Sequence, residues 1–362
     1  MQTSIPYMQF RGGSSKGLYF EARHLPENII QRDRILLACM EGVGMGDPRQ
    51  IDGLGGAHSL TSKIAIVSPS KTMEADLDYL FLQVEIGKGK ISTAQNCGNI
   101  LAGVVPFAIE SGMIQAQEGF TKASINMLNT GGICEILVQT PHSKVEYSGK
   151  ARVDGVPGTA APIICNYLGT EGSTCGSLIP TGNLIDRVDG IELTCIDNGM
   201  PVVLLEAKSL GISGYETPEE LNLNEGLKER LEDIRLKIGP KMNLGEVKHK
   251  TIPKICLISP PRMNGIINTR MFIPHVCHEA IGVLAAISVA TASVIPGSIN
   301  HRVFNTPNSL HELSIEHPTG ELTVSLDYQI DEWGKINIHR SGVMRTARLI
   351  SKGEVFIPPL AL

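Results

Sequence analysis

One apolar stretch, AIGVLAAISVATASVI at residues 280–295, constrains the fold of this chain more than any other feature. It is sixteen residues long and is interrupted by Gly, Ser and Thr, so it is too short and too polar to span a bilayer. A helix that is apolar on every side is buried within protein instead. The sequence therefore predicts a core helix over 278–294, with the rest of its domain packed around it.

Short strand-like segments separated by turns flank this helix and recur around a second one. The chain has 38 glycines and 21 prolines in 362 residues, which indicates many turns, and alternating apolar residues at 5–20, 63–70 and 77–86 are typical of strands. A second apolar helix is expected at 100–112, a helix at 28–40 and a charged surface helix at 217–239. Because 362 residues are many for one core, we expect two similar α/β lobes, residues 1–180 and 181–349.

Charge and cysteine usage exclude several classes of function. The net charge is −5 and no basic block is present, which argues against a nucleic-acid partner. The first residues lack the pattern of a secretory signal, so we expect a cytoplasmic protein that does not enter a membrane. The eight cysteines form no CxxC pair and have no zinc spacing, so they are expected to be thiols. His275 and His278, three residues apart and next to Cys277, could bind a metal, but no carboxylate triad is evident, so no metal site is predicted.

The segment QNCGN at 95–99 places Cys97 directly before the apolar helix at 100–112. The first N–H groups of a helix have no internal partner, so they bind anions and favour the thiolate of a cysteine at that position. Gly98 leaves room for a ligand near the backbone, and Asn96 and Asn99 supply neutral donors and acceptors. Cys97 is therefore a candidate acid, base or nucleophile; the alternative is a buried cysteine in a turn.

Two further segments carry candidate site residues. Lys63 stands where a glycine-rich loop meets the apolar strand of LTSKIAIV, and a partly buried lysine there can exchange protons or bind a carboxylate. A lysine whose stem lies along the strand while its amine reaches solvent is the equally weighted alternative. The turn RGGSSKG at 11–17 offers N–H and hydroxyl groups that can hold a carboxylate or phosphate, and it lacks the Walker pattern.

The segments RGGSSKG, DPRQIDGLGGAHSLTSK, LDYLF, NCGN, DGVPGTAAPI and RTARLISKGEVFIP, in this order, resemble the PrpF family of isomerases from about residue 4 to residue 359. The resemblance implies the diaminopimelate epimerase-like fold: two lobes, each a curved, barrel-like sheet around a central helix, with the active site in the cleft between them. It also implies that the C-terminal strand, residues 350–362, returns to the first lobe.

The family's chemistry is a proton shift without a cofactor, in which the lysine of TSK and the cysteine of NCGN act as acid and base. These residues are Lys63 and Cys97 here, and which of them is the base stays open. Cys277 is a tentative partner acid. The substrate is an acidic small molecule, so the predicted binding residues are hydroxyl, amide, glycine and cationic groups: Ser14, Ser15, Lys16, Arg49, Ser62, Asn96, Gly98, Asn99, Arg270 and His275.

Within the family the chain looks most like the tautomerases that act on 4-oxalomesaconate during gallate or protocatechuate-type aromatic degradation. Isomerisation of 2-methylaconitate or 3-methylitaconate is the alternative of the same class. A hydrolase with Cys97 as nucleophile, or an accessory binding protein, are the alternatives of other classes. The expected partner is a di- or tricarboxylate, and the sequence leaves a homodimer open.

Overall fold

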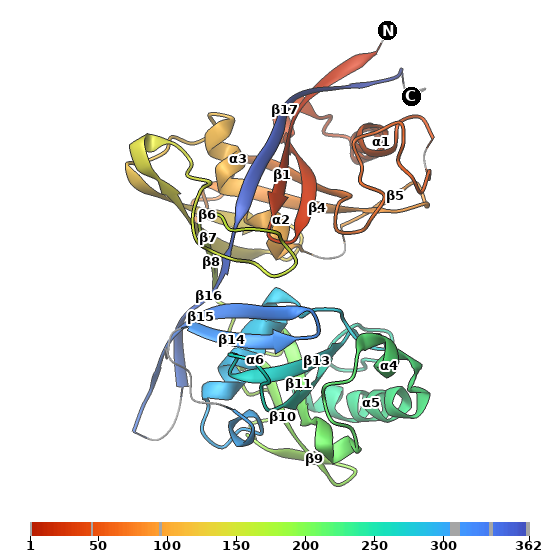
Figure 1. Ribbon diagram of the computed structural model, residues 1–362, viewed down its shortest axis with the longest axis vertical. Helices are drawn as coiled ribbons and strands as arrows, with labels where there is room; N and C mark the ends of the chain where they lie inside the picture. The colour runs from red at the N-terminus through yellow and green to blue at the C-terminus, as the bar shows by residue number, and fades with distance from the viewer. Residues whose placement is uncertain (1, 45, 94–95, 305–311, 333–335, 360–362) are drawn as a thin grey trace. The chain divides into compact units, whose positions relative to one another are not determined.

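The computed structural model describes every residue except 1, 45, 94–95, 305–311, 333–335 and 360–362. The chain forms two compact units (Figure 1). Unit 1 comprises residues 1–166 and 344–362, and unit 2 comprises residues 167–343. The chain passes between the units within β8 (Ile163–Leu168) and again within β16 (Ile336–Arg345).

Unit 1 is one sheet with helices on both of its faces. Its strands are β1 (Thr3–Gly12), β2 (Ser15–Glu21), β3 (Lys63–Pro69), β4 (Leu77–Glu85), β5 (Lys90–Ser92), β6 (Gly119–Met127), β7 (Gly132–Thr140) and β17 (Ala347–Ile357). Its helices are η1 (Ala22–His24), α1 (Ile29–Glu41), α2 (Gly98–Leu101), α3 (Val104–Glu110) and η2 (Pro141–Ser143). The strands pair in the order β17–β1–β2–β3–β4–β6–β7, with β5 paired to the end of β4.

The two faces of this sheet follow from strand alternation. Leu18, Ile64 and Leu82 share one face with the buried side of α1 in a single apolar cluster. Tyr19 lies on the opposite face, where its hydroxyl donates to the carbonyl of Ile100 in α2 (2.5 Å) and its ring packs against Phe107 of α3. The short helices α2 and α3 therefore cover one face of the sheet and α1 covers the other.

Unit 2 has a sheet of eight strands among the described residues. The strands are β9 (Asp186–Val188), β10 (Ile191–Asp197), β11 (Pro201–Glu206), β12 (Lys254–Ser259), β13 (Ile267–Phe272), β14 (Glu312–His317), β15 (Gly320–Ile330) and β16, and they pair in this order. The helices are η3 (Ala207–Leu210), α4 (Pro218–Leu223), α5 (Glu225–Ile238), η4 (Gly239–Met242), α6 (Val283–Val294) and η5 (Asn300–Arg302).

The faces of this second sheet are covered in the same way. Val203, Ile255 and Phe272 lie in one apolar cluster with the buried side of α5. The opposite face packs against α6, in which every residue from 285 to 294 is buried. The predicted buried core helix is confirmed as α6, but it begins at Val283 and not at residue 278, because Gly282 is its N-cap.

The two sheets share one pairing pattern. In unit 1 the pairs β1–β2, β2–β3, β3–β4, β4–β6 and β6–β7 are antiparallel, parallel, antiparallel, parallel and antiparallel. In unit 2 the pairs β10–β11, β11–β12, β12–β13, β13–β14 and β14–β15 follow the same series. The two units therefore share one pairing pattern, with helices on both faces of each sheet, as the predicted fold of two similar lobes requires.

The prediction of two continuous helices is wrong, because each is divided into two shorter helices. The helix expected at 100–112 is divided into α2 and α3, with Gly103 as the N-cap of the second piece. The helix expected at 217–239 is divided at Asn224, which ends α4 and whose side chain accepts the N–H of Leu227 as the N-cap of α5. Asparagine favours such caps because its amide oxygen substitutes for a backbone acceptor.

The boundary between the units also differs from the predicted residue 180. Residues 169–180 belong to unit 2, because the N–H of Gly172 donates to the carbonyl of Asp197 and the Asp197 N–H donates to Leu178. The Asp197 carboxylate also accepts the N–H groups of Thr174 and Cys175. The last strand, β17, pairs with β1 along its length, and residues 360–362 of the predicted 350–362 segment lie outside the described residues.

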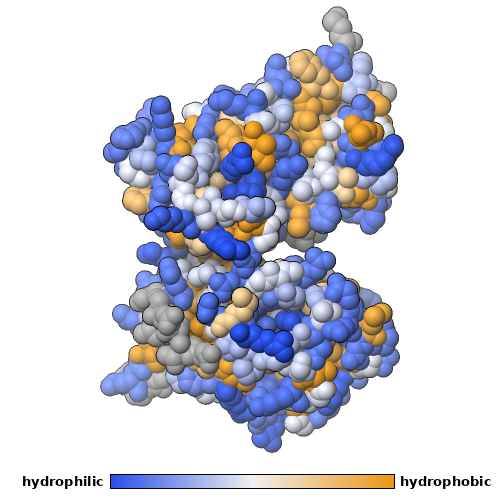
Figure 2. Space-filling view, viewed as in Figure 1, coloured by the Kyte–Doolittle hydropathy of each residue, from blue (hydrophilic) through white to orange (hydrophobic). Residues whose placement is uncertain are grey.

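The surface of the units is mainly hydrophilic on the face drawn in Figure 2, where apolar side chains form separate patches. Exposed large apolar residues of unit 1 include Ile29, Ile30, Ile51 and Phe356. None of the helices in the described ranges is long and apolar enough to cross a membrane.

Candidate active site

Cys97 is the N-cap of α2. Its N–H donates to the side-chain oxygen of Asn96 (2.8 Å), and its carbonyl accepts the N–H of Leu101 (2.9 Å) and the hydroxyl of Tyr79 (3.2 Å). These contacts hold the backbone in an extended conformation, and the residue remains partly exposed. Since α2 has only four residues, its dipole is small.

The turn RGGSSKG packs directly against the Cys97 loop. A Cβ atom at Gly12 would lie 2.2 Å from the carbonyl oxygen of Asn99, and one at Gly13 would lie 2.1 Å from its side-chain oxygen. Gly13 also has a φ of +50°, which favours glycine. The amide of Asn99 donates to the hydroxyl of Ser14 (3.2 Å) and reaches Ser15 at 3.5 Å. The structure therefore brings these two predicted segments together.

Lys63 opens β3 and lies on the sheet face that α2 and α3 cover. Its side chain is buried (7% exposed), and Nζ donates to Oε1 of Gln83 (2.7 Å) and lies 5.2 Å from the ring centre of Phe81. Tyr79, Phe81 and Gln83 alternate along β4 on that face, so one strand contacts both the Cys97 backbone and the Lys63 amine. A ring face and an amide oxygen both stabilise a positive charge.

The amide of Gln83 has only one favourable orientation. Its Nε2 lies 3.1–3.2 Å from the carbonyl oxygens of Ser59, Ser62 and Val84. Turning the amide would place Oε1 against these three acceptors and the NH2 group against Lys63, which also donates. Gln83 therefore presents an acceptor to one N–H of the Lys63 ammonium group and leaves the other N–H groups to a ligand.

Ser62 is held on both sides. Its hydroxyl donates to Oε1 of Gln50 (2.6 Å) and accepts the N–H of Gly56, while its carbonyl accepts from Gln83. Gln50 in turn contacts the buried carboxylate of Glu41 (3.4 Å). The Ser62 hydroxyl, predicted to bind substrate, is fully buried within this network, where it fixes the loop before Lys63.

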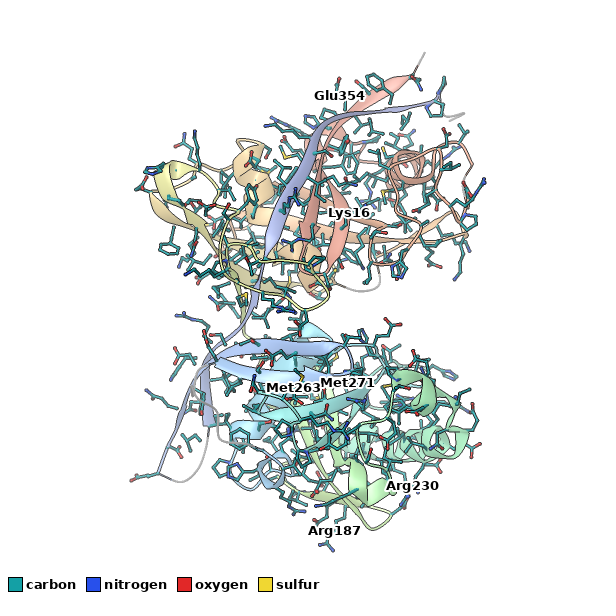
Figure 3. The ribbon with its side chains drawn as sticks, viewed as in Figure 1. Lys16, Arg187, Arg230, Met263, Met271 and Glu354 are labelled. Atoms are coloured by element: carbon teal, nitrogen blue, oxygen red, sulfur yellow. The ribbon has the colours of Figure 1, made fainter. Side chains whose placement is uncertain are left out.

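Two predicted cations of unit 1 lie apart from Lys63. Lys16, labelled in Figure 3, is on β2 next to Gly17. Because Gly17 pairs with Lys63, alternation directs Lys16 to the opposite face, that of α1. Arg49 is in an exposed loop and pairs with Asp47 (3.3 Å). Lys63 is thus the predicted cation that shares its sheet face with the Cys97 loop.

The predicted residues of unit 2 lie on its α5 side. Arg270 is buried on β13, where Nε donates to the carbonyl of Glu216 (2.6 Å) and Nη1 donates to Thr269 and Asn268. His275 is exposed in a turn, 3.7 Å from a carboxylate oxygen of Glu232. These contacts hold Arg270 within its own unit.

Cys277 is buried in the apolar cluster around Phe272. Burial raises the pKa of its thiol to about 11, and the charge of Arg270 offsets part of that effect. Cys277 does not occupy the position in unit 2 that Cys97 occupies in unit 1. Its backbone forms an isolated antiparallel β-bridge with Phe272, six residues before the start of α6, whose N-cap is Gly282.

Gln83 and Lys254 were missed in the sequence. Lys254 is the first residue of β12, as Lys63 is of β3, and the segments KIAIVSP (63–69) and KICLISP (254–260) are identical at the Lys, Ile, Ser and Pro positions. This short repeat was the available signal. Gln83 had none, because its role depends on the pairing of β3 with β4.

The described part of the chain contains no group of three or more His, Cys, Asp or Glu side chains that could hold a metal ion.

The comparisons with known proteins cover almost the whole chain. The family model described as PrpF protein matches residues 2–358. The chain belongs to the PrpF family. A 4-oxalomesaconate tautomerase of Pseudomonas putida is 51% identical over 98% of this chain and 97% of its own length. A (4E)-oxalomesaconate Delta-isomerase of Novosphingobium sp. is 50% identical over 98% of each chain.

Among solved structures, methylitaconate-delta-isomerase superposes with a TM-score of 0.86 at 32% identity, covering 98% of this chain and 96% of that one. This similarity confirms the predicted fold class. The names of the relatives also match the predicted class of enzyme, an isomerase of the PrpF family.

Proposed function

We propose that this enzyme catalyses a keto–enol proton shift on 4-oxalomesaconate or a closely related unsaturated tricarboxylate, without a cofactor. The observation that carries the proposal is the identity of about one half, over nearly the full length, to two proteins named for oxalomesaconate. A role in the breakdown of aromatic compounds, in the cytoplasm, is part of the same proposal.

The contacts in unit 1 support acid–base chemistry. Cys97 and Lys63 are two groups that can transfer protons on one face of the sheet, and Tyr79 and Gln83 of β4 contact them. One of them removes the C–H proton next to the keto group, and the other protonates the enolate oxygen. The reaction is balanced, because one proton leaves carbon and one is added to oxygen.

Substrate carboxylates need donors near these groups. Ser14, Ser15 and Asn99 form a connected set of hydroxyl and amide groups beside Cys97, and Asn96 lies on its other side. We propose these as the carboxylate-binding groups of unit 1, with the N–H groups around Gly98. Arg270, His275 and Cys277 remain proposals for unit 2.

The test is ultraviolet absorbance with 4-oxalomesaconate, 2-methylaconitate and 3-methylitaconate, compared in normal and deuterated water. We expect turnover of the first acid, deuterium incorporation and no hydrolysis product. Cys97→Ala and Lys63→Met should each lower kcat by about 100-fold or more, whereas Cys134→Ala, a buried thiol on β7, should not. Hydrolysis products would favour a cysteine hydrolase, and full turnover by Cys97→Ala would refute the proposed chemistry.

Turnover of 3-methylitaconate alone would instead assign the chain to its second candidate function. The observation that favours this alternative is the TM-score of 0.86 to methylitaconate-delta-isomerase.

A further inference from the structure

The shared pairing pattern of the two sheets gives each residue around Lys63 a counterpart in unit 2. In the parallel pair of β2 and β3, Gly17 lies opposite Lys63. In the parallel pair of β11 and β12, Val202 lies opposite Lys254. Lys254 therefore occupies in unit 2 the position that Lys63 occupies in unit 1.

Strand alternation directs the two lysines to corresponding faces. Ile64 belongs to the cluster under α1, which places its neighbour Lys63 on the face of α2 and α3. Ile255 belongs to the cluster under α5, which places its neighbours Lys254 and Cys256 on the α6 face. Met271 of β13, labelled in Figure 3, pairs with Cys256. Each lysine is thus on the face that its core helix covers.

The surroundings of Lys254 differ from those of Lys63 in one respect. Lys254 is 9% exposed, and no described residue accepts a hydrogen bond from its Nζ or pairs with it as a carboxylate. Continuing the register of Ile255 with Phe272 places Ile273 opposite Lys254, where unit 1 has Gln83 opposite Lys63. The stem of Lys254 is therefore buried while its ammonium group has no acceptor among the described residues, and such a cation favours a ligand that supplies a negative charge.

A second donor lies near this amine. His278, in the loop that leads to α6, accepts the N–H of Ala280 at Nδ1 (2.8 Å). A neutral imidazole that accepts at Nδ1 carries its proton at Nε2, so the ring presents an N–H donor on its other side. The N–H of His278 donates to the carbonyl of Met271 (2.7 Å), and Met271 pairs with Cys256, two residues from Lys254 on β12. Burial lowers the pKa of His278, whereas the charge of Glu279 raises it and that of Lys254 lowers it.

Among the described residues, Arg235 is the charged group that acts on Lys254. Burial lowers the pKa of Lys254 to about 8, with a further contribution from Arg235 of α5. Arg235 itself is paired with Glu232 through two hydrogen bonds. Glu279, next to His278, is exposed and forms no ion pair with Lys254. Lys254 therefore has no carboxylate partner among the described residues.

We propose that Lys254 and His278 form an anion-binding site on the α6 face of unit 2, which takes a carboxylate group of a small organic acid. The carboxylate accepts one hydrogen bond from Nζ of Lys254 and one from Nε2 of His278. The choice of a carboxylate rests on the proposed function, whereas the site itself rests on the burial and the missing partner of Lys254.

Tricarballylate, a saturated tricarboxylate that cannot tautomerise, is the probe. Its affinity for the full-length protein is measured by calorimetry at pH 7 and low ionic strength. Lys254→Met should weaken binding by about 10-fold or more, the loss expected for one charge-assisted hydrogen bond. Lys254→Arg should keep most of the affinity, and Lys248→Met, which removes an exposed lysine, should stay within about 2-fold of the wild type. The affinity of the wild type should fall as the pH rises through about 8.

The outcomes separate this site from the proposed function. Equal affinity of the wild type and Lys254→Met, or no binding by the wild type, overturns the site even if the enzyme turns over 4-oxalomesaconate. Binding that depends on Lys254, in a protein that turns over none of the three unsaturated acids, keeps the site and refutes the proposed function. A melting temperature of Lys254→Met near that of the wild type shows that a loss of affinity is not a loss of folding.

Discussion

Gln83 offers the sharpest test of how Lys63 is held. Gln83→Met keeps the length of the side chain but removes the acceptor 2.7 Å from Nζ and the donor to three carbonyls. A hydrogen bond to a charged group contributes about 1.5–3 kcal/mol. If the full amount acts on the transition state, kcat falls by about 10- to 150-fold. The carbonyl of Ser62 keeps its bond from the Val84 N–H, so the free energy of unfolding should fall by only about 1–2 kcal/mol.

The assay measures kcat and KM for 4-oxalomesaconate by ultraviolet absorbance, together with the melting temperature. Gln139→Met is the matched control, because Gln139 is a strand glutamine of β7 whose side chain bonds to no described residue. Gln83→Glu adds a readout that a purely structural role would not change: a carboxylate beside Lys63 stabilises its ammonium form, so the pH–rate profile should move to higher pH. The reasoning is wrong if Gln83→Met keeps kcat within about 3-fold, or if Gln139→Met loses as much.

Three further results are expected. Gly13→Ala should lower the free energy of unfolding by at least about 1 kcal/mol and disturb the Cys97 loop. The added Cβ would lie 2.1 Å from the side-chain oxygen of Asn99, in a backbone with a φ of +50°. Urea unfolding measures the loss of stability, and kcat measures the disturbance of the loop. At pH 7, iodoacetamide should modify Cys97 before Cys277, whose buried thiol has a pKa near 11, and peptide mass spectrometry with Cys97→Ser as control would contradict this if Cys277 reacted first. The pKa of Lys254 is lower in the folded protein, about 8, than its usual 10.5, so the unfolded chain binds more protons between these pH values. The free energy of unfolding should therefore rise with pH in that window. Denaturant titrations of Lys254→Met should show a flatter dependence on pH there.

Much of the fold could be predicted because local patterns determine it. The apolar stretch of α6 has no alternative to burial, and the Asn198–Gly199 turn between β10 and β11 is readable from its two residues. The divisions of the helices at Gly103 and Asn224 were harder, because apolar spacing continues across both positions. At Asn224 the side-chain cap of α5 prevails over helix propensity.

The candidate site depends on register, which the sequence shows only weakly. Lys16 and Lys63 are both lysines at turns, yet the parallel pairing of Gly17 with Lys63 directs them to opposite faces. Likewise, Lys254 and Ile255 are neighbours on β12, and they point to opposite faces: Ile255 to the α5 face and Lys254 to the α6 face. Pairing between strands distant in sequence decides such faces, and no local pattern encodes it.

The pairing of β1 with β17 also determines the order in which the chain can be completed during synthesis. Unit 2 is inserted between two pieces of unit 1, so all of its residues leave the ribosome before β17 does. Until then β1 has an unpaired edge, which is the kind of surface that joins other chains. The nascent N-terminal piece must therefore wait, with that edge open, for the whole of unit 2 to be made, and at about 5–20 residues per second the delay is on the order of ten seconds or more. A chaperone that binds exposed strand edges would act in that interval.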